Sequence, residues 1–120
     1  MSLLETKKIP KIIHQTWKTK HIPKEFQSYH KKIKTTFKEF EHILWTDKDN
    51  RDFIEEKFSW FLPIYDGYKK NIERVDAVRY FILYEYGGIY MDLDYSVRSN
   101  FYDKLEPVSY THLRAHETRY

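Results

Sequence analysis

Two aspartates one residue apart, Asp92 and Asp94, follow a Gly-Gly pair and a short apolar run in the sequence GGIYMDLD. Asp76 lies sixteen positions before Asp92, and Arg79 follows Asp76 three residues later. Carboxylate oxygens suit Mg²⁺ and Mn²⁺, which keep coordination positions open for substrate phosphates. A guanidinium fork binds phosphate or carboxylate oxygens through two parallel hydrogen bonds. These four residues therefore predict a site for a divalent cation and an anionic, hydroxyl-rich ligand.

The aspartate pair ends a segment that we expect to form a strand, Ile89–Leu93. Residues i and i+2 of a strand point to the same side, so Asp92 and Asp94 should face one way and Leu93 should face the packed side. The strand rise separates the two carboxylates by roughly 6–7 Å, which favours one direct metal ligand and one that acts through water. Taken alone, such a pair is more typical of two aspartates at the start of a loop.

The segment before the pair has the pattern of a helix over Asn71–Tyr86, which Gly87 and Gly88 end. On a helical wheel Arg79 falls inside the apolar arc, and Asp76 lies just beyond it. Burying an arginine is costly unless its fork meets carboxylates or a ligand. The alternative is an ion pair between these two residues at the edge of the buried face. With Asp92 expected nearby, the pattern favours a ligand-binding cluster.

Strand and helix patterns alternate along the rest of the chain, which predicts an α/β fold with a mainly parallel three-stranded core and flanking helices. Strands are expected at Lys11–Trp17, Glu41–Thr46 and Ile89–Leu93. Helices are expected from Pro23 to Phe40, over Lys48–Phe58 with Asp47 as N-cap, and over Asn71–Tyr86. Pro63 and Gly67 break the aromatic stretch Ser59–Lys70, so irregular structure is expected there.

The carboxyl edge of the expected sheet is where open α/β sheets bind ligands. Trp17 ends the first strand at this edge, where its indole could stack on a nucleobase or simply fill the core. Asp47 lies at the same edge, either as a helix cap or as a ligand contact. His14 is more typical of a hydrogen-bonded structural histidine than of a catalyst.

Composition narrows the class of protein. The 120 residues suffice for one small domain, and the net charge of +3 is too balanced to indicate a nucleic-acid partner. With no cysteine, disulfides and thiolate metal sites are excluded. Neither a signal peptide nor a membrane span is expected, so we expect a cytoplasmic or peripheral membrane location. Lysines concentrate in the first 40 residues, either as a solvated face or as a surface for anionic lipid or phosphate.

The end of the chain differs in character. Residues 107–120 resemble a translated sequencing-adapter read-through, VSYTHLRAHET, so we expect a native part at 1–106 and a non-native tail at 107–120. His112 and His116 in this tail could share a metal ion on a helix, but no third ligand is evident.

Three segments together resemble one family: IPKIIHQTWK at Ile9–Lys18, ILWTD at Ile43–Asp47, and IERVDAVRYFILYEYGGIYMDLD at Ile72–Asp94. They are similar to the DxD-containing sugar transferases that include the yeast initiating α-1,6-mannosyltransferase and the inositol-phosphoceramide mannosyltransferases, glycosyltransferase family 32. The stretch WFLPIYDGYKKNIERVDAVRY resembles the inositol-phosphoceramide branch most. The resemblance covers about residues 9–106 and implies a Rossmann-like GT-A nucleotide-sugar-binding fold, of which this chain would hold the N-terminal part only.

The resemblance also implies a reaction. Such enzymes transfer a hexose such as mannose from a nucleotide sugar, GDP-mannose or a UDP-hexose, to a glycan or glycolipid acceptor with retention of configuration. It implies Mn²⁺ or Mg²⁺ as cofactor and, for the fungal members, a Golgi membrane location and sphingolipid acceptors. Asp92 and Asp94 match the catalytic DxD that binds the metal and the donor diphosphate. Asp76 and Arg79 match helix positions that contact the donor sugar and phosphate.

Two aromatic residues complete the candidate site. Trp17 matches an aromatic residue that packs against the nucleotide base in related enzymes, and Tyr90 lies one strand step before Asp92, where it would line the same pocket. GT-A domains are usually much longer, and the acceptor half should follow residue 106, which leaves the activity of this chain open. One alternative is a catalytically inactive nucleotide-sugar-binding fragment. Another is an aspartyl phosphatase with DLDYS as its nucleophile loop, although only 26 residues follow Asp94.

Overall fold

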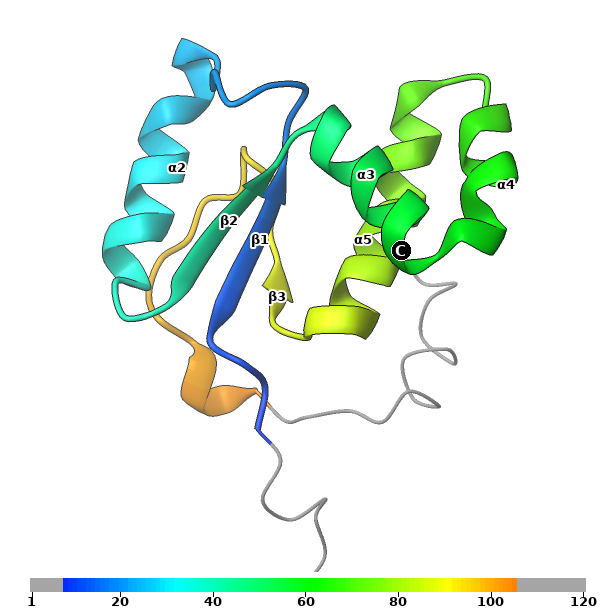
Figure 1. Ribbon diagram of the computed structural model, residues 1–120. Coiled ribbons are helices and arrows are strands. Elements are labelled where there is room, and N and C mark those ends of the chain that lie inside the picture. Colours follow the sequence, from blue (N-terminus) through cyan, green and yellow to red (C-terminus); the bar gives the residue numbers. More distant parts are fainter. Residues whose placement is uncertain (1–7, 106–120) are drawn as a thin grey trace, which may run out of the picture.

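The computed structural model describes residues 8–105 and contains one parallel three-stranded sheet (Figure 1). The strands are β1 (Ile12–Thr16), β2 (Glu41–Trp45) and β3 (Ile89–Tyr90), in the order β2-β1-β3. The predicted α/β class and the parallel sheet are therefore confirmed. The proposed tail at 107–120, with His112 and His116, lies outside the described residues.

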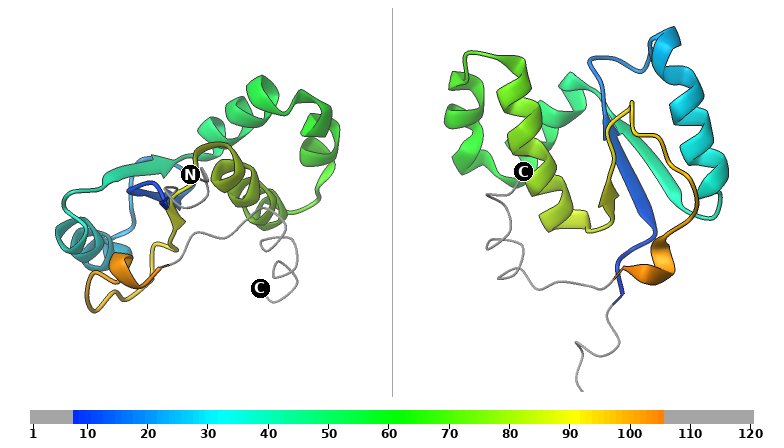
Figure 2. Two further views of the ribbon diagram at one scale, coloured as in Figure 1. Left: turned by 90° about the horizontal axis from the view of Figure 1, so that it is seen from below. Right: turned by 180° about the vertical axis from the view of Figure 1, so that it is seen from behind.

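Helices cover both faces of the sheet. They are α2 (Lys24–Thr36), α3 (Asp47–Lys57), α4 (Leu62–Gly67) and α5 (Asn71–Tyr86), with short 3₁₀ turns η1 (Ser59–Phe61) and η2 (Tyr102–Lys104). Figures 1 and 2 show α2 on one side of the sheet and the other three helices together on the opposite side.

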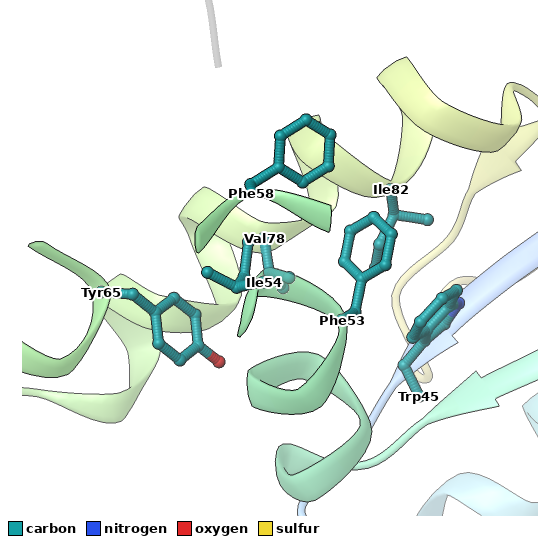
Figure 3. Packing of buried hydrophobic residues seen from close by; sticks show 7 residues of the cluster. All are labelled: Trp45, Phe53, Ile54, Phe58, Tyr65, Val78 and Ile82. Carbon is teal, nitrogen blue, oxygen red and sulfur yellow. The ribbon is translucent and has the colours of Figure 1, made fainter. Parts of the chain in front are cut away.

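Each face of the sheet has its own apolar core. On the α2 side the buried residues are Ile13, Ile33, Phe37, Phe40, Met91 and Val97. On the other side they are Trp45, Phe53, Ile54, Phe58, Tyr65, Val78 and Ile82 (Figure 3). In the second cluster the rings of Phe53 and Trp45 pack edge to face at 5.3 Å, which ties α3 to β2.

The third strand is shorter than predicted. β3 ends at Tyr90, and the hydrogen bond from Met91 N to His14 O, at 2.9 Å, is the last that links it to β1. The chain then bends, because Tyr95 N donates to Asp92 O at 3.1 Å and closes a turn of the kind in which aspartate is favoured as first residue. The expectation of a strand through Leu93 was wrong, and Asp92 and Asp94 lie in this turn.

The prediction of irregular structure over Ser59–Lys70 was also wrong for most of that stretch. η1 and α4 make it helical from residue 59 to 67. Pro63 lies in the first turn of α4, where its missing N–H has no partner to lose. The proline therefore starts this helix and does not break it.

The ends of the two longer helices after β2 follow from local chemistry. Thr46, and not Asp47 as predicted, caps α3: its hydroxyl accepts from Asp49 N at 3.1 Å, and the Asp49 carboxylate accepts from Thr46 N at 3.0 Å. α5 has the predicted bounds, and Gly87 follows it with φ 68°, a backbone conformation that favours glycine.

Candidate functional site

A cavity of about 440 Å³ opens at the carboxyl end of the sheet. Four of the six predicted site residues line it: Trp17, Tyr90, Asp92 and Asp94. They come from the ends of β1 and β3, which lie side by side in the sheet. The structure therefore brings the aspartate pair and the two aromatic residues together, as the sequence predicted.

The Asp92–Asp94 turn presents its carboxylates outward. Leu93 between them is only 5% exposed, whereas both aspartates are exposed, so the predicted alternation holds although the segment is not a strand. Among residues 8–105, neither Asp92 nor Asp94 has an ion-pair partner. Two carboxylates without a counter-charge at the rim of a cavity are suited to a cation.

The backbone of this turn is held by a buried glutamine that sequence reasoning did not single out. Gln15 is 2% exposed, and its Nε2 donates to Asp92 O at 3.5 Å. Its Oε1 accepts from His30 Nδ1 at 2.8 Å, so the amide joins α2 to the turn. No local pattern could have identified it, because its partners lie 15 and 77 residues away.

Tyr90 provides a hydroxyl next to Asp92. Its Oη lies 2.8 Å from Thr16 Oγ1, and both residues line the cavity. Burial raises the pKa of the Tyr90 phenol, and the neighbouring Asp92 carboxylate adds to the rise against the opposing effects of Thr16 and Arg79. The phenol therefore stays protonated at neutral pH and can donate a hydrogen bond.

Asp76 and Arg79 lie beside the cavity, and neither lines it. Arg79 Nη2 lies 3.2 Å from Asp76 Oδ1, which is the ion pair named above as the alternative. The Arg79 guanidinium carbon is also 5.5 Å from the centre of the Tyr90 ring, a cation–π contact. Arg79 and Asp76 are thus linked to the cavity by the contact of Arg79 with Tyr90, which lines it. Neither of them forms an ion pair with Asp92 or Asp94.

An apolar wall faces the acidic rim. It is formed by Trp17, by Phe26 of α2, and by Ile72 and Val75 in the first turns of α5. The Trp17 and Phe26 rings pack edge to face, with centres 5.5 Å apart. The sequence predicted a helix from Pro23 to Phe40 but not the part of Phe26 in this wall, which only the packing of α2 against the end of β1 reveals. A wall of this kind can take a planar aromatic ring.

Asp47 adds a third carboxylate to the lining. It is the first residue of α3, and both of its carboxylate oxygens accept from Asn71 Nδ2 at 3.2 Å. Because Thr46 makes the cap, the Asp47 carboxylate is not used by its own helix. It links the starts of α3 and α5 at the ligand edge.

The donor set fits a hard divalent cation only in part. Among the residues that the structure describes, no three histidine, aspartate or glutamate side chains converge as a metal site. Asp92 and Asp94 would hold Mg²⁺ or Mn²⁺ with further oxygens from water or a phosphate ligand, which is how such ions are usually bound in phosphate-handling sites.

His14 is structural, as predicted. It is fully buried, its Nε2 lies 2.8 Å from Gly87 O, and its Nδ1 accepts from Trp45 Nε1 at 3.1 Å. These partners fix the neutral tautomer with the proton on Nε2. Burial lowers the pKa of His14, although the hydrogen bond to Gly87 opposes the shift. Both ring nitrogens are occupied, so none is left for a substrate.

The glycosyltransferase sugar-binding region containing the DXD motif is the family whose model matches the chain, over residues 23–116. The chain belongs to this family. The matched residues include Asp76, Arg79 and the Asp92–Asp94 turn, whereas Trp17 lies before them.

Several named proteins are similar to the chain. Inositol phosphoceramide mannosyltransferase 3 of Schizosaccharomyces pombe is 56% identical over 86 residues, 72% of this chain and 24% of that protein. A mannosyl phosphorylinositol ceramide synthase of Saccharomyces cerevisiae is 50% identical over the same share of this chain and 22% of its own length. The initiation-specific alpha-1,6-mannosyltransferase of Candida albicans is 33% identical over 97 residues, 75% of this chain and 25% of that protein.

The chain spans about a quarter of the length of these relatives. No solved structure gives a significant match. None of the helices within residues 8–105 has the length and apolar character needed to cross a membrane.

Proposed function

We propose that this chain is the donor-binding part of a metal-dependent, retaining glycosyltransferase with a Rossmann-like GT-A fold. The observation that carries the proposal is the Asp92–Asp94 turn, which lies at the carboxyl edge of a parallel sheet in one cavity with Trp17. This edge is the usual ligand position in open α/β sheets. Family membership supports the same assignment.

In this proposal each side of the cavity binds one part of a nucleotide sugar. Asp92 and Asp94 would hold Mn²⁺ or Mg²⁺, which when bound would neutralise charge on the leaving diphosphate. Trp17 and Phe26 would pack against the base. The Tyr90 phenol beside Asp92 would orient that carboxylate or donate to a phosphate oxygen.

Asp76 and Arg79 are proposed to contact the donor sugar and phosphate. Their present ion pair and the cation–π contact with Tyr90 place them next to the cavity wall. Because the Arg79 guanidinium contacts the Tyr90 ring, a donor bound at Tyr90 would lie close to it. No side chain is assigned as a catalytic base. No protein nucleophile is assigned either, because retention by front-face attack needs none.

The substrates are proposed from the names of the relatives, several of which are mannosyltransferases of inositol phosphoceramide. The donor would be GDP-mannose or a UDP-hexose, and the acceptor a glycan or a glycolipid. A lipid acceptor would bring the protein to a membrane surface, such as that of the Golgi. We also propose the division into a donor-binding part at 1–106 and a non-native tail at 107–120, into which the family match extends as far as residue 116.

The direct test is calorimetric titration of the chain with GDP-mannose, UDP-glucose and UDP-galactose, with and without Mn²⁺. We expect Mn²⁺-dependent binding of one donor and a loss of about tenfold or more in affinity for Asp92→Asn and Asp94→Asn, because each change removes a ligand charge. Asp103→Asn, an exposed carboxylate in η2 outside this cavity, is the matched control and should bind like the unaltered chain.

Three other outcomes separate the alternatives. Equal affinity of the two variants and the unaltered chain would refute the metal assignment. Binding without sugar transfer would identify an inactive nucleotide-sugar-binding fragment. Turnover of a generic phosphoester, lost in Asp92→Asn, would assign the phosphatase reaction instead.

A further inference from the structure

The lining of the cavity includes a carboxylate that the proposed metal site does not use. Asp47 is half-buried, and within residues 8–105 it has no ion-pair partner. Its two carboxylate oxygens accept from one atom, Asn71 Nδ2, at 3.2 Å each. A carboxylate has about four lone-pair sites, so this contact leaves Asp47 able to accept hydrogen bonds from a ligand.

The ends of two neighbouring strands place Asp47 beside the aromatic wall. Just beyond β1 and β2, Trp17 N donates to Trp45 O at 3.0 Å, and Asp47 N donates to Lys18 O at 3.2 Å. The two backbone segments therefore lie side by side, and both Trp17 and Asp47 line the cavity. Asp47 is thus next to the residue against which we propose that the base packs.

The same topology separates Asp47 from the acidic turn. Asp47 follows β2 and Asp92 follows β3, and β1 lies between these two strands. Neighbouring strands are about 4.8 Å apart, so the two strand ends lie roughly 10 Å apart along the edge of the sheet. In a nucleoside diphosphate the base and the diphosphate lie at opposite ends, with the ribose between them. A diphosphate bound at Asp92 would therefore bring the base towards Asp47.

The hydrogen-bonding capacity of a carboxylate favours one base over the others. Guanine presents two adjacent N–H donors, at N1 and N2, and an acceptor oxygen, O6, on one edge. A carboxylate can accept from two parallel donors at once, as it does from the fork of an arginine. Uracil has a single N–H between two acceptor oxygens, and adenine has an acceptor at N1. Neither of these bases can give the carboxylate two adjacent donors.

We propose that Asp47 binds the base of the donor nucleotide and selects guanine. Its carboxylate accepts from N1–H and N2–H of the base. Lys18, which also lines the cavity and whose Nζ lies 5.8 Å from the centre of the Trp17 ring, donates to O6. This inference rests on the proposed function, because it assigns the base end of the same donor site. Asp47 is then a residue that determines specificity, besides linking α3 to α5 through Asn71.

Ribose is the other part of a nucleotide that a carboxylate commonly binds, through its hydroxyl groups. The position of Asp47 beside Trp17, two strands away from Asp92, favours the base. The two assignments also differ in their consequences. Ribose is common to all the nucleotides, so a ribose contact would strengthen GDP and UDP binding equally, whereas a base contact creates a preference between them.

The test is calorimetric titration of the full chain with GDP, UDP and xanthosine diphosphate in the presence of Mn²⁺. Xanthine has an oxygen in place of the N2 amino group of guanine, so it would set an acceptor against the Asp47 carboxylate. We expect the unaltered chain to bind GDP about tenfold or more tightly than either of the others. Asp47→Asn should reverse the order of GDP and xanthosine diphosphate, because an amide accepts from N1–H and donates to that oxygen.

Two controls show whether the effect is local. Asp52→Asn, at an exposed carboxylate of the same helix that does not line the cavity, should keep the preference for GDP. Urea unfolding of Asp47→Asn should match that of the unaltered chain within about 0.5 kcal/mol, because Thr46 and not Asp47 caps the helix. A gain in affinity for xanthosine diphosphate also requires a folded site.

Three results would overturn the inference. One is equal affinity of the unaltered chain for GDP and UDP. Another is a loss of GDP and UDP affinity by the same factor in Asp47→Asn, which would assign Asp47 to the ribose. The third is an Asp47→Asn variant that still prefers GDP to xanthosine diphosphate. Nucleotide binding that depends on Mn²⁺ and Asp92 but not on the base would refute this inference alone, whereas no binding of any nucleotide would refute the proposed function with it.

Discussion

His14 and Asp92 lie close together in the fold. The ring nitrogens of His14 are hydrogen-bonded inside the protein, whereas the side chain of Asp92 is exposed. His14 is paired in register with Tyr90, two residues before Asp92. Both nitrogens of the buried His14 ring are committed, one to Gly87 O and one to Trp45 Nε1. Asp92 and Asp94 are exposed and have no counter-charge within the described part of the chain.

This difference separates polar residues that are hydrogen-bonded inside the fold from exposed polar residues that stay available to a ligand. A buried donor or acceptor without a partner costs free energy, so the interior keeps only groups that are paired. The exposed carboxylates contribute little to folding and are held in place through their backbone, by Gln15 and the turn to Tyr95. The following predictions test whether the two regions are as distinct as this comparison implies.

The largest expected effect is at His14. His14→Ala would leave a cavity and two unpaired buried groups, Trp45 Nε1 and Gly87 O. We expect the free energy of unfolding to fall by about 3–4 kcal/mol, measured by urea denaturation. A loss below about 1 kcal/mol would show that His14 does not organise the interior, and the comparison would fail.

The next effect is at the turn that contacts His14. A Cβ on Gly88 would lie 2.6 Å from Ile12 O and 3.2 Å from His14 Nε2, at φ 95°. We expect Gly88→Ala to cost about 2–4 kcal/mol in thermal or urea unfolding. Gly67→Ala is the matched control: its Cβ meets nothing within 4 Å, so stability should stay the same or rise by about 0.5 kcal/mol. Similar losses for both variants would contradict the close packing at Gly88.

A smaller effect concerns pH. Burial lowers the pKa values of His14 and His30 in the folded state, so below pH 6.5 the unfolded chain takes up protons that the folded chain resists. Stability should therefore be full above pH 6.5 and fall as the pH drops below it, by at most about 1.4 kcal/mol per pH unit for each group. Urea midpoints at pH 7.5 and 5.5 would measure this, and a flat profile would contradict it.

The smallest effect on stability is expected for the two exposed aspartates of the cavity, Asp92 and Asp94. Asp92→Asn and Asp94→Asn should change the free energy of unfolding by less than about 0.5 kcal/mol, since both side chains are exposed. The same variants should lose donor binding, as proposed above. A marked loss of stability together with the loss of binding would place these carboxylates among the residues that build the fold.

Much of the fold could be predicted from local patterns. α5 begins and ends where the apolar periodicity and the glycine pair indicated, and the parallel order followed from alternating strands and helices. The wrong predictions arose where the same residue type is compatible with two local structures. Proline breaks a helix interior but starts a helix, as Pro63 does. Thr46 and Asp47 are both good caps, and only the structure shows which one is used.

The candidate site could be predicted less completely. Asp92, Asp94, Trp17 and Tyr90 follow from a simple rule, because strand ends of a parallel sheet meet at one edge. Gln15 and Phe26 could not be found in this way, because their roles depend on how α2 docks against β1. Asp76 and Arg79 form the ion pair that their i, i+3 spacing allowed, and the spacing alone could not show that neither side chain lines the cavity.

The glycine pair after α5 has a consequence for how a ligand is received. Pro10 and Ile12 fill the space that side chains at Gly87 and Gly88 would need, so helix α5 and strand β1 should behave as one rigid body. The separation between the start of α5 and the acidic turn would then be set before any ligand binds. Recognition would depend on the rotation of individual side chains in a preorganised frame, which limits the entropy lost on binding.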